Sequence, residues 1–267
     1  MKENKSYAVP AIMRAIAVLD YLGEKEHAGF NEICEELGLS KSTAYGVLNT
    51  LLQEGFLRTS AQGGYSLGIK LFSLGSKALS TMDIRSEAQP LMQALVNEVD
   101  QTSHLGVLDG GEAVYLAKVE CEQNLIVRSW VGMRLSLQTS AMGKVMLAWR
   151  DEAEVRELLQ KNPPSRYTSR AIMNTEAFIS HLTQVRKHGV AVDNRETNED
   201  NLCLAAPVFS SQKTPIGAIS VSIPNPRLNK NVFTRVAKRV HSASSDLSRR
   251  LGSAYYPAYE EPEYPGE

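Results

Sequence analysis

A stretch of short polar side chains near the N-terminus carries groups that proteins use to contact DNA. It provides an ammonium, two hydroxyls, a phenol and a carboxamide, on Lys41, Ser42, Thr43, Tyr45 and Asn49. Ammonium and hydroxyl groups donate to phosphate oxygens, and carboxamides read base edges. These groups can act together only if one structural element presents them on one side.

Apolar residues at helical spacing predict that element. Positions 44, 47, 48 and 51 are Ala, Val, Leu and Leu, on the side of a helix opposite the polar groups. Ser40 precedes the helix and predicts an N-cap, because its hydroxyl can accept from a free backbone N–H. Gly38 supplies the positive φ that ends a shorter helix containing Ile33 and Leu37. Two helices joined in this way predict a helix-turn-helix with its second helix in the major groove.

A small hairpin is predicted directly after the second helix. Residues 55–58 begin one strand, residues 61–64 form a Gly-rich turn, and residues 65–67 return as a second strand. A hairpin here makes the winged form of the motif, and it places Arg58 beside the DNA backbone. A helical hairpin without DNA contact is the alternative that the two helices alone leave open.

The charge of the N-terminal region opposes DNA binding mildly. Residues 1–70 contain seven Lys or Arg and eight Asp or Glu, so the net charge is −1. DNA-binding domains are usually basic, because neutralising phosphates supplies much of the affinity. We therefore expect locally placed cations, modest affinity for each domain, and specificity from a dimer, or a dimer of dimers, on a palindromic double-stranded site.

Composition narrows the class of protein further. The chain of 267 residues is 43% hydrophobic and 22% charged, as expected for a soluble globular protein of two domains. Its longest apolar runs are far shorter than a membrane span, which predicts no membrane contact. Cys34, Cys121 and Cys203 have no metal-binding or disulfide-framework spacing, so we expect reduced thiols in the cytoplasm, no metal site and no cofactor.

The remainder of the chain predicts an α+β domain, in which strands are mostly antiparallel and helices are segregated around them. Strands are expected at 103–108, 113–119, 125–130, 204–209 and 216–223, and helices at 83–101, 141–149, 152–160, 175–188 and 230–251. The predicted domains are a winged helix-turn-helix at 1–68, a linker helix at 69–83, the α+β domain at 84–253 and a disordered Tyr, Pro and Glu-rich tail at 254–267.

Two stretches of the α+β domain could carry chemistry. Residues 138–144 enter a helix through small residues and a hydroxyl cap, and free N–H groups at a helix N-terminus attract anions. A plain capped helix is the alternative. The second stretch combines residues 193–196, 203–207 and 219–222. Strand alternation places Ser220 and Ser222 on one face, where an acid and a thiol could complete a polar pocket. A surface loop and a half-exposed edge strand are the alternatives here.

These patterns together resemble the IclR family of bacterial transcriptional regulators, over nearly the whole chain. The resemblance rests on the Ser-Lys-Ser-Thr helix at 40–43, the wing ending in Tyr-Ser-Leu-Gly at 65–68, the Gly-Lys helix at 143–144 and the Cys-x-Ala-x-Pro strand at 203–207. It implies a DNA-binding regulator, a linker helix that contributes to dimer contacts, and an effector-binding domain of GAF-like fold.

The resemblance also implies which residues contact an effector. Leu125, Val127 and Leu135 would form an apolar wall, and Ala141 and Met142 would give backbone N–H groups to a carboxylate. Ligand hydroxyl or keto oxygens would contact Asp193, Cys203, Ser220 and Ser222. Two positions depart from the family pattern: Gly46 replaces an Arg of the recognition helix, and Asp200 replaces a Gly in the acidic loop.

The effector implied by the resemblance is a sugar acid or keto-deoxy sugar acid such as 2-keto-3-deoxygluconate, and the regulator is expected to be a repressor. Aromatic or glyoxylate-type acids are the alternative effectors. An enzyme is a competing class, since Asp193, Cys203 and His104 or His188 resemble parts of a nucleophilic site. No spacing supports catalysis, so no catalytic residue is predicted. A protein-interaction module without DNA contact is the third interpretation.

Overall fold

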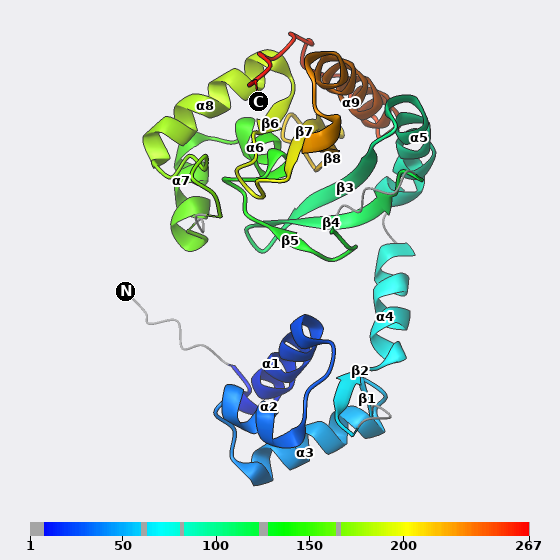
Figure 1. Cartoon of the computed structure of the whole chain (residues 1–267), viewed down its shortest axis with the longest axis vertical. Coiled ribbons are helices and arrows are strands. Elements are labelled where there is room, and N and C mark those ends of the chain that lie inside the picture. The colour runs from blue at the N-terminus through cyan, green and yellow to red at the C-terminus, as the bar shows by residue number, and fades with distance from the viewer. Residues whose placement is uncertain (1–7, 60–62, 81–82, 123–127, 164–166, 267) are drawn as a thin grey trace. The chain divides into compact units, whose positions relative to one another are not determined.

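The computed structural model describes residues 8–59, 63–80, 83–122, 128–163 and 167–266 of the chain (Figure 1). These residues divide into two compact units, Met1–Thr81 and Met82–Glu267. Among the described residues, no helix combines the length and the apolar run needed to cross a bilayer.

The N-terminal unit is a winged helix-turn-helix followed by one further helix. Its elements are α1 (Pro10–Lys25), α2 (Phe30–Glu36), α3 (Lys41–Gln53), β1 (Leu57–Thr59), β2 (Tyr65–Leu67) and α4 (Ile69–Ser80). Gly38 ends the α2 turn at φ 59°, and the Ser40 hydroxyl accepts from the Thr43 N–H at 3.3 Å. The wing strands pair antiparallel, Leu57 opposite Leu67, and a bridge from Ala28 to Tyr65 joins the wing to the loop before α2.

The C-terminal unit is built on a six-stranded antiparallel sheet in the order β5-β4-β3-β8-β7-β6. Its strands are β3 (Thr102–Asp109), β4 (Glu112–Val119), β5 (Arg134–Leu135), β6 (Ala191–Asp193), β7 (Asn201–Val208) and β8 (Gly217–Pro224). Its helices are α5 (Asp83–Val99), α6 (Ala141–Ala148), α7 (Glu152–Lys161), α8 (Thr175–His188) and α9 (Lys230–Arg250), with a 3-10 turn η1 (Asn225–Arg227). The expected α+β class is confirmed.

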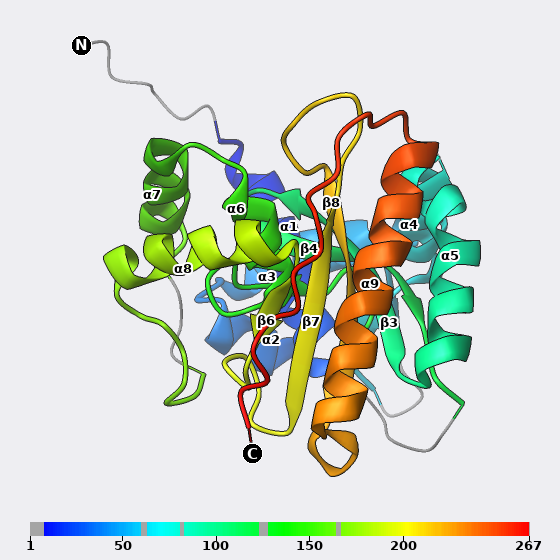
Figure 2. The same ribbon diagram turned by 90° about the horizontal axis from the view of Figure 1, so that it is seen from above.

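Helices cover both sides of this sheet. Helices α5 and α9 pack together and on β3, β7 and β8, whereas α6 packs on β6, β7 and β8 and against α8 (Figure 2). A buried apolar cluster joins α6, α7 and α8 to Ala113, Tyr115, Ala205 and Ala218 of the strands. The small strand residues let α6 lie close to the sheet, and this face holds the polar pocket described below.

Two expectations for the C-terminal unit differ from the structure. The strand predicted at 125–130 is not found over 128–130, and residues 123–127 lie outside the described residues. The edge strand is instead β5, which follows a turn at Gly132 (φ 93°) and pairs Leu135 with Ala113. The short strand β6, which ends at Asp193, was not predicted either, because three residues carry too little periodicity to reveal it.

The segment predicted to be a disordered tail is a strap packed on the C-terminal unit. Pro257 and Pro262 are buried, and the Tyr256 hydroxyl donates to the Pro207 carbonyl at 3.0 Å. The Tyr256 ring also meets His241 edge-on at 4.9 Å. Aromatic and proline side chains therefore anchor a segment whose composition alone suggests disorder.

Candidate functional site

The exposed side of α3 carries the predicted DNA-contacting groups. Lys41, Ser42, Tyr45 and Asn49 are exposed, with Tyr45 at 66%, and Thr43 is half-buried. The opposite side is buried in the core of the unit through Ala44, Leu48 and Leu51. One helix thus presents all five predicted groups, and Lys41 is its first residue.

The N-cap residue of α3, Ser40, contacts two of the five predicted side chains. The Ser40 hydroxyl donates to the Thr43 hydroxyl at 2.8 Å and lies 3.2 Å from the Ser42 hydroxyl. The wing adds Arg58 on β1, exposed and opposite Ser66. The acidic Glu32, in contrast, accepts from the Tyr21 hydroxyl at 2.9 Å. That hydrogen bond lowers the pKa of Glu32 and ties its charge to the α1–α2 contact.

Gly46, one of the two departures from the pattern that the resemblance predicted, lies on the exposed side of α3. A Cβ added at Gly46 would meet no atom within 4 Å, and the Gly46 carbonyl accepts from the Thr50 hydroxyl at 2.8 Å. Packing therefore does not require glycine at this position. The other departure, Asp200, is exposed in a turn and does not have a positive φ. Neither position has a backbone conformation or a close contact that requires the residue present.

A cavity of about 240 Å³ lies in the C-terminal unit beside the N-terminus of α6. It is smaller than the roughly 300–1,000 Å³ typical of sites for drug-sized ligands, which suits a small metabolite. The structure brings seven of the nine predicted effector residues to its wall, namely Leu135, Ala141, Met142, Asp193, Cys203, Ser220 and Ser222. The other two, Leu125 and Val127, lie outside the described residues.

The hydroxyl and thiol wall follows from strand register. Cys203 lies opposite Ser222 on the neighbouring strand, and Ser220 lies two residues further along the same face. The Cys203 sulfur is 3.4 Å from the Ser222 hydroxyl oxygen. Burial raises the pKa of the Cys203 thiol to about 12, so the group is neutral at physiological pH. This wall offers weak donors and acceptors rather than a nucleophile.

The N-terminus of α6 forms a wall of free donors. The Ser140 hydroxyl caps the helix by accepting from the Gly143 N–H at 3.1 Å, while the N–H groups of Ala141 and Met142 have no acceptor among the described residues. A Cβ added at Gly143 would lie 2.3 Å from the Leu137 Cα atom, so only glycine permits this approach of the helix. Free N–H groups together with the helix dipole are the features that attract anions to helix N-termini.

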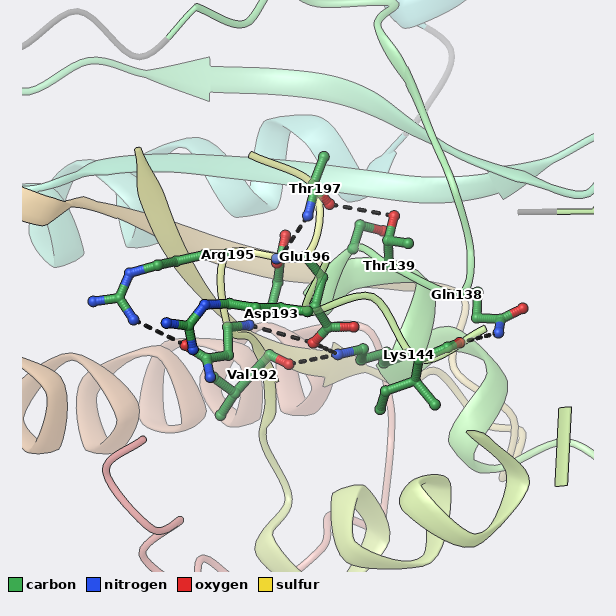
Figure 3. Close-up of polar contacts among 12 residues, drawn as sticks. Gln138, Thr139, Lys144, Val192, Asp193, Arg195, Glu196 and Thr197 are labelled. Atoms are coloured by element: carbon green, nitrogen blue, oxygen red, sulfur yellow. Dashed lines mark hydrogen bonds and ion pairs between the residues drawn. The ribbon is translucent and has the colours of Figure 1, made fainter. Parts of the chain in front are cut away.

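The acidic loop after β6 supplies the third wall. The Asp193 carboxylate accepts from the N–H groups of Glu196 at 2.7 Å and Thr197 at 3.2 Å (Figure 3). Arg195 takes a positive φ of 61° inside this turn. Burial raises the pKa of Asp193, and the Lys144 ammonium opposes that shift. The turn thus holds the Asp193 carboxylate at the cavity, and one of its oxygens already accepts two backbone hydrogen bonds.

Several lining residues were missed by sequence reasoning. They are Tyr115, Arg128, Ser129, Met133, Arg134, Ser136, Ser140, Tyr167, Thr197, Asn198 and Asn201. Tyr115 had a usable signal, since β4 was predicted and strand alternation assigns it a face. The side chains from loops had none, because loop conformation determines which of them reach the cavity.

The residues considered for catalysis do not assemble into a catalytic site. His104 stacks on Tyr115 with ring centroids 4.3 Å apart, and its Nε2 lies 2.8 Å from the Ser129 hydroxyl. His188 Nδ1 lies 3.1 Å from the Glu260 carbonyl in the C-terminal strap, and within the described residues no hydrogen bond joins Cys203 to a histidine. The described ranges also hold no cluster of three or more His, Cys, Asp or Glu side chains that could bind a metal ion.

A winged helix-turn-helix unit joined to an α+β unit with a small polar cavity defines a two-domain DNA-binding transcriptional regulator. The sequence pattern of the IclR helix-turn-helix domain matches residues 11–61. That of the bacterial transcriptional regulator IclR C-terminal domain matches residues 76–249. The chain therefore belongs to the IclR family.

Known relatives support the assignment over almost the whole chain. The HTH-type transcriptional regulator KdgR of Escherichia coli K12 is 35% identical over 94% of this chain and 95% of its own length. The regulator XynR of the same organism is 34% identical over 94% of this chain and 99% of its own length. The crystal structure of IclR from Thermotoga maritima has 29% identity and a TM-score of 0.74, covering 90% of this chain and 98% of that one.

These matches confirm the predicted family, the predicted fold and the function as a DNA-binding regulator. The enzyme interpretation is set aside, because the relatives are named as regulators. The residues assigned to DNA and effector contacts remain predictions.

Proposed function

We propose that this chain is a repressor whose operator binding is controlled by a small carboxylate in the C-terminal cavity. One observation carries the proposal: Ala141, Met142, Ser220 and Ser222 line the same cavity. The Ala141 and Met142 N–H groups have no acceptor among the described residues, and the two serines add hydroxyls. A ligand that bears a carboxylate at one end and hydroxyls along its chain complements both walls. Sugar acids and keto-deoxy sugar acids have this chemistry, whereas aromatic and glyoxylate-type acids lack the row of hydroxyls.

On the DNA side, α3 enters the major groove of a palindromic operator. Lys41, Ser42 and Thr43 contact phosphates near the helix start, while Tyr45 and Asn49 reach base edges. Arg58 on the wing contacts the backbone beside the groove. The protein acts in the cytoplasm, where the bacterial chromosome lies.

Exposed apolar residues on α1 and α4 support self-association as a dimer or a dimer of dimers. The exposed apolar residues are Val9 at the N-cap of α1, Ile12, Met13 and Ile16 on α1, and Ile69, Phe72 and Leu74 on α4. Contiguous apolar surface of this kind marks interaction sites on proteins. Pairing through these helices sets the spacing of two recognition helices, and each effector-bound domain biases that spacing.

We expect the coupling between effector and operator to have the size that is usual for allosteric proteins. Allosteric coupling energies of about 1–3 kcal/mol correspond to roughly 5–150-fold changes in affinity. A gel shift on the promoter of the chain's own gene, with and without saturating ligand, measures this ratio. A thermal-shift panel of hexonates, keto-deoxy sugar acids, glyoxylate, pyruvate and hydroxybenzoates supplies the ligand. Identical operator binding curves with a ligand that does raise the melting temperature would contradict the coupling.

Two variants separate the halves of the proposal. Ser220→Ala with Ser222→Ala removes the hydroxyl wall, so effector affinity falls while operator affinity without effector is retained. Lys41→Ala removes one phosphate contact, so operator affinity falls and the salt slope becomes shallower by about 1. Binding to the promoter with no salt dependence would instead favour a protein-interaction module.

A further inference from the structure

We propose that Arg128 binds a second anionic group of the effector, which makes the preferred ligand one with two anionic groups: a sugar diacid or a phosphorylated sugar acid. The inference rests on the proposed function of the cavity as the effector site. It concerns a side chain that sequence reasoning did not select.

Arg128 is a cation of the cavity wall that has no partner among the described residues. Two guanidinium groups line the cavity, Arg128 and Arg134. Arg134 donates to Asp109 at 2.6 Å and to Glu112 at 3.2 Å, so its charge is already balanced by two carboxylates. Arg128 forms no hydrogen bond or ion pair with any residue that the structure describes, and it is exposed. A ligand anion is therefore the partner for which Arg128 is available.

The backbone beside Arg128 is held in place. The adjacent Ser129 hydroxyl lies 2.8 Å from His104 Nε2, and the Lys118 ammonium donates to the Ser129 carbonyl at 2.9 Å. These contacts come from β3 and β4, so the sheet fixes the backbone next to Arg128. An arginine presented from a fixed backbone loses less freedom on binding than one on an unsupported loop.

The N-terminus of α6 and the segment that carries Arg128 contact the sheet at different residues of β3. The Met142 side chain, from the N-terminus of α6, lies against Gly106 of β3, because a Cβ added there would be 2.6 Å from the Met142 sulfur. Ser129 contacts His104, two residues earlier on the same strand. The N-terminus of α6 and the backbone beside Arg128 therefore contact β3 at different residues, which suits a ligand with an anionic group at each end.

The chemistry of the guanidinium favours a carboxylate or a phosphate as the second group. Its planar fork donates two parallel N–H bonds to either anion, and such charge-assisted bonds are roughly twice as strong as neutral ones. The remaining hydroxyl-bearing carbons of the ligand then face Ser220 and Ser222. The cavity would accordingly distinguish a monoacid from its own terminally oxidised or phosphorylated derivative.

Titration calorimetry on the full-length protein with matched ligands tests the inference. The series is gluconate, glucarate and 6-phosphogluconate, together with 2-keto-3-deoxygluconate and its 6-phosphate. We expect at least one ligand with two anionic groups to bind about tenfold tighter than its monoanionic parent. Whether the carboxylate or the phosphate derivative binds better identifies the second group. Arg128→Met should abolish that preference while leaving affinity for the parent within about twofold, and Arg128→Lys should keep part of it.

Arg170→Met, which removes an exposed arginine outside the cavity lining, is the matched charge control. Equal affinity of the wild-type protein for the parent and for the ligands with two anionic groups overturns the inference but leaves the effector site in place. A preference for two anionic groups that survives in Arg128→Met overturns it as well. Binding of none of the five ligands overturns the proposed sugar-acid function itself, and the inference with it.

Discussion

Lys144 on α6 forms a fully buried ion pair with Glu196 in the loop after β6, and its ammonium also donates to the Val192 carbonyl at 2.8 Å. One side chain therefore joins the helix that offers free N–H groups to the loop that carries Asp193. A second link runs from the Thr197 hydroxyl to the Thr139 hydroxyl at 3.4 Å (Figure 3). Two walls of the cavity are thus held as one assembly.

Replacing Lys144 with Met should destabilise the C-terminal unit strongly. Removing one partner of a buried ion pair leaves an uncompensated charge and costs about 3–5 kcal/mol. Urea unfolding followed by tryptophan fluorescence measures the loss, and it reports on this unit alone because both tryptophans, Trp130 and Trp149, belong to it.

The double variant Lys144→Met with Glu196→Gln is the control. It removes both charges, so the free energy of unfolding should recover by at least about 1 kcal/mol relative to Lys144→Met alone. If the two variants unfold at the same urea concentration, the cost lies in side-chain packing and the electrostatic argument fails.

The ion pair also shows where sequence reasoning ends. The small-residue entry to α6 and the alternation of Ser220 and Ser222 are local patterns, and the structure brings both to one cavity. Lys144 and Glu196 are 52 positions apart, and no local pattern pairs them. Arg128 was missed for another reason: it lies in the stretch 125–130, which was predicted as a strand, whereas residues 128–130 are irregular.

The C-terminal strap was mispredicted for a different reason: its composition is polar and Pro-rich, but its few large side chains bind the folded unit. Truncation after Ser253 should therefore lower stability. It removes the contacts of Tyr256 with Pro207 and His241, and the edge contact of Tyr264 with Phe233 at 5.4 Å. Aromatic pairs contribute about 0.5–1.5 kcal/mol each, beyond the area that they bury.

We expect a total loss of at least ~2 kcal/mol, which lowers the melting temperature by at least ~4 °C in a unit of this size. Differential scanning calorimetry of full-length and truncated protein checks this value. Glu263→Ala, which changes an exposed strap residue and leaves the anchors intact, should melt like the wild type. An unchanged melting temperature after truncation would restore the prediction of a disordered tail.

Buried His104 should make stability depend on pH on the acid side. Burial, with a smaller effect of Lys118, lowers the pKa of His104 to about 3, against an ordinary value of 6.5. The unfolded chain therefore takes up a proton first as pH falls. The stabilising contribution is present above pH 6.5 and is lost progressively toward pH 3, at up to about 1.4 kcal/mol per pH unit.

His104→Gln removes this titrating group and keeps a side chain that can bond to Ser129. Between pH 6.5 and 4.5, its free energy of unfolding should fall by about 2 kcal/mol less than that of the wild type. Urea titrations at several pH values measure both curves. Parallel curves would mean that His104 is protonated in the folded protein or that water reaches it.

Two substitutions at the exposed Gly46 allow the effect of helix stability to be distinguished from the effect of DNA contact. Because an added Cβ meets no atom there, Gly46→Ala should stabilise α3 by about 1 kcal/mol through helix propensity alone. Gly46→Arg gains the same propensity and adds a cation between Tyr45 and Asn49 on the exposed side of the helix. Operator affinity should then rise for Gly46→Arg but not for Gly46→Ala, and the slope of log affinity against log salt should steepen by about 1.

Fluorescence anisotropy with labelled operator between about 50 and 200 mM salt measures both quantities. Equal slopes for the Ala and Arg variants would place this side of α3 away from the phosphates, and the orientation proposed for the recognition helix would have to be revised.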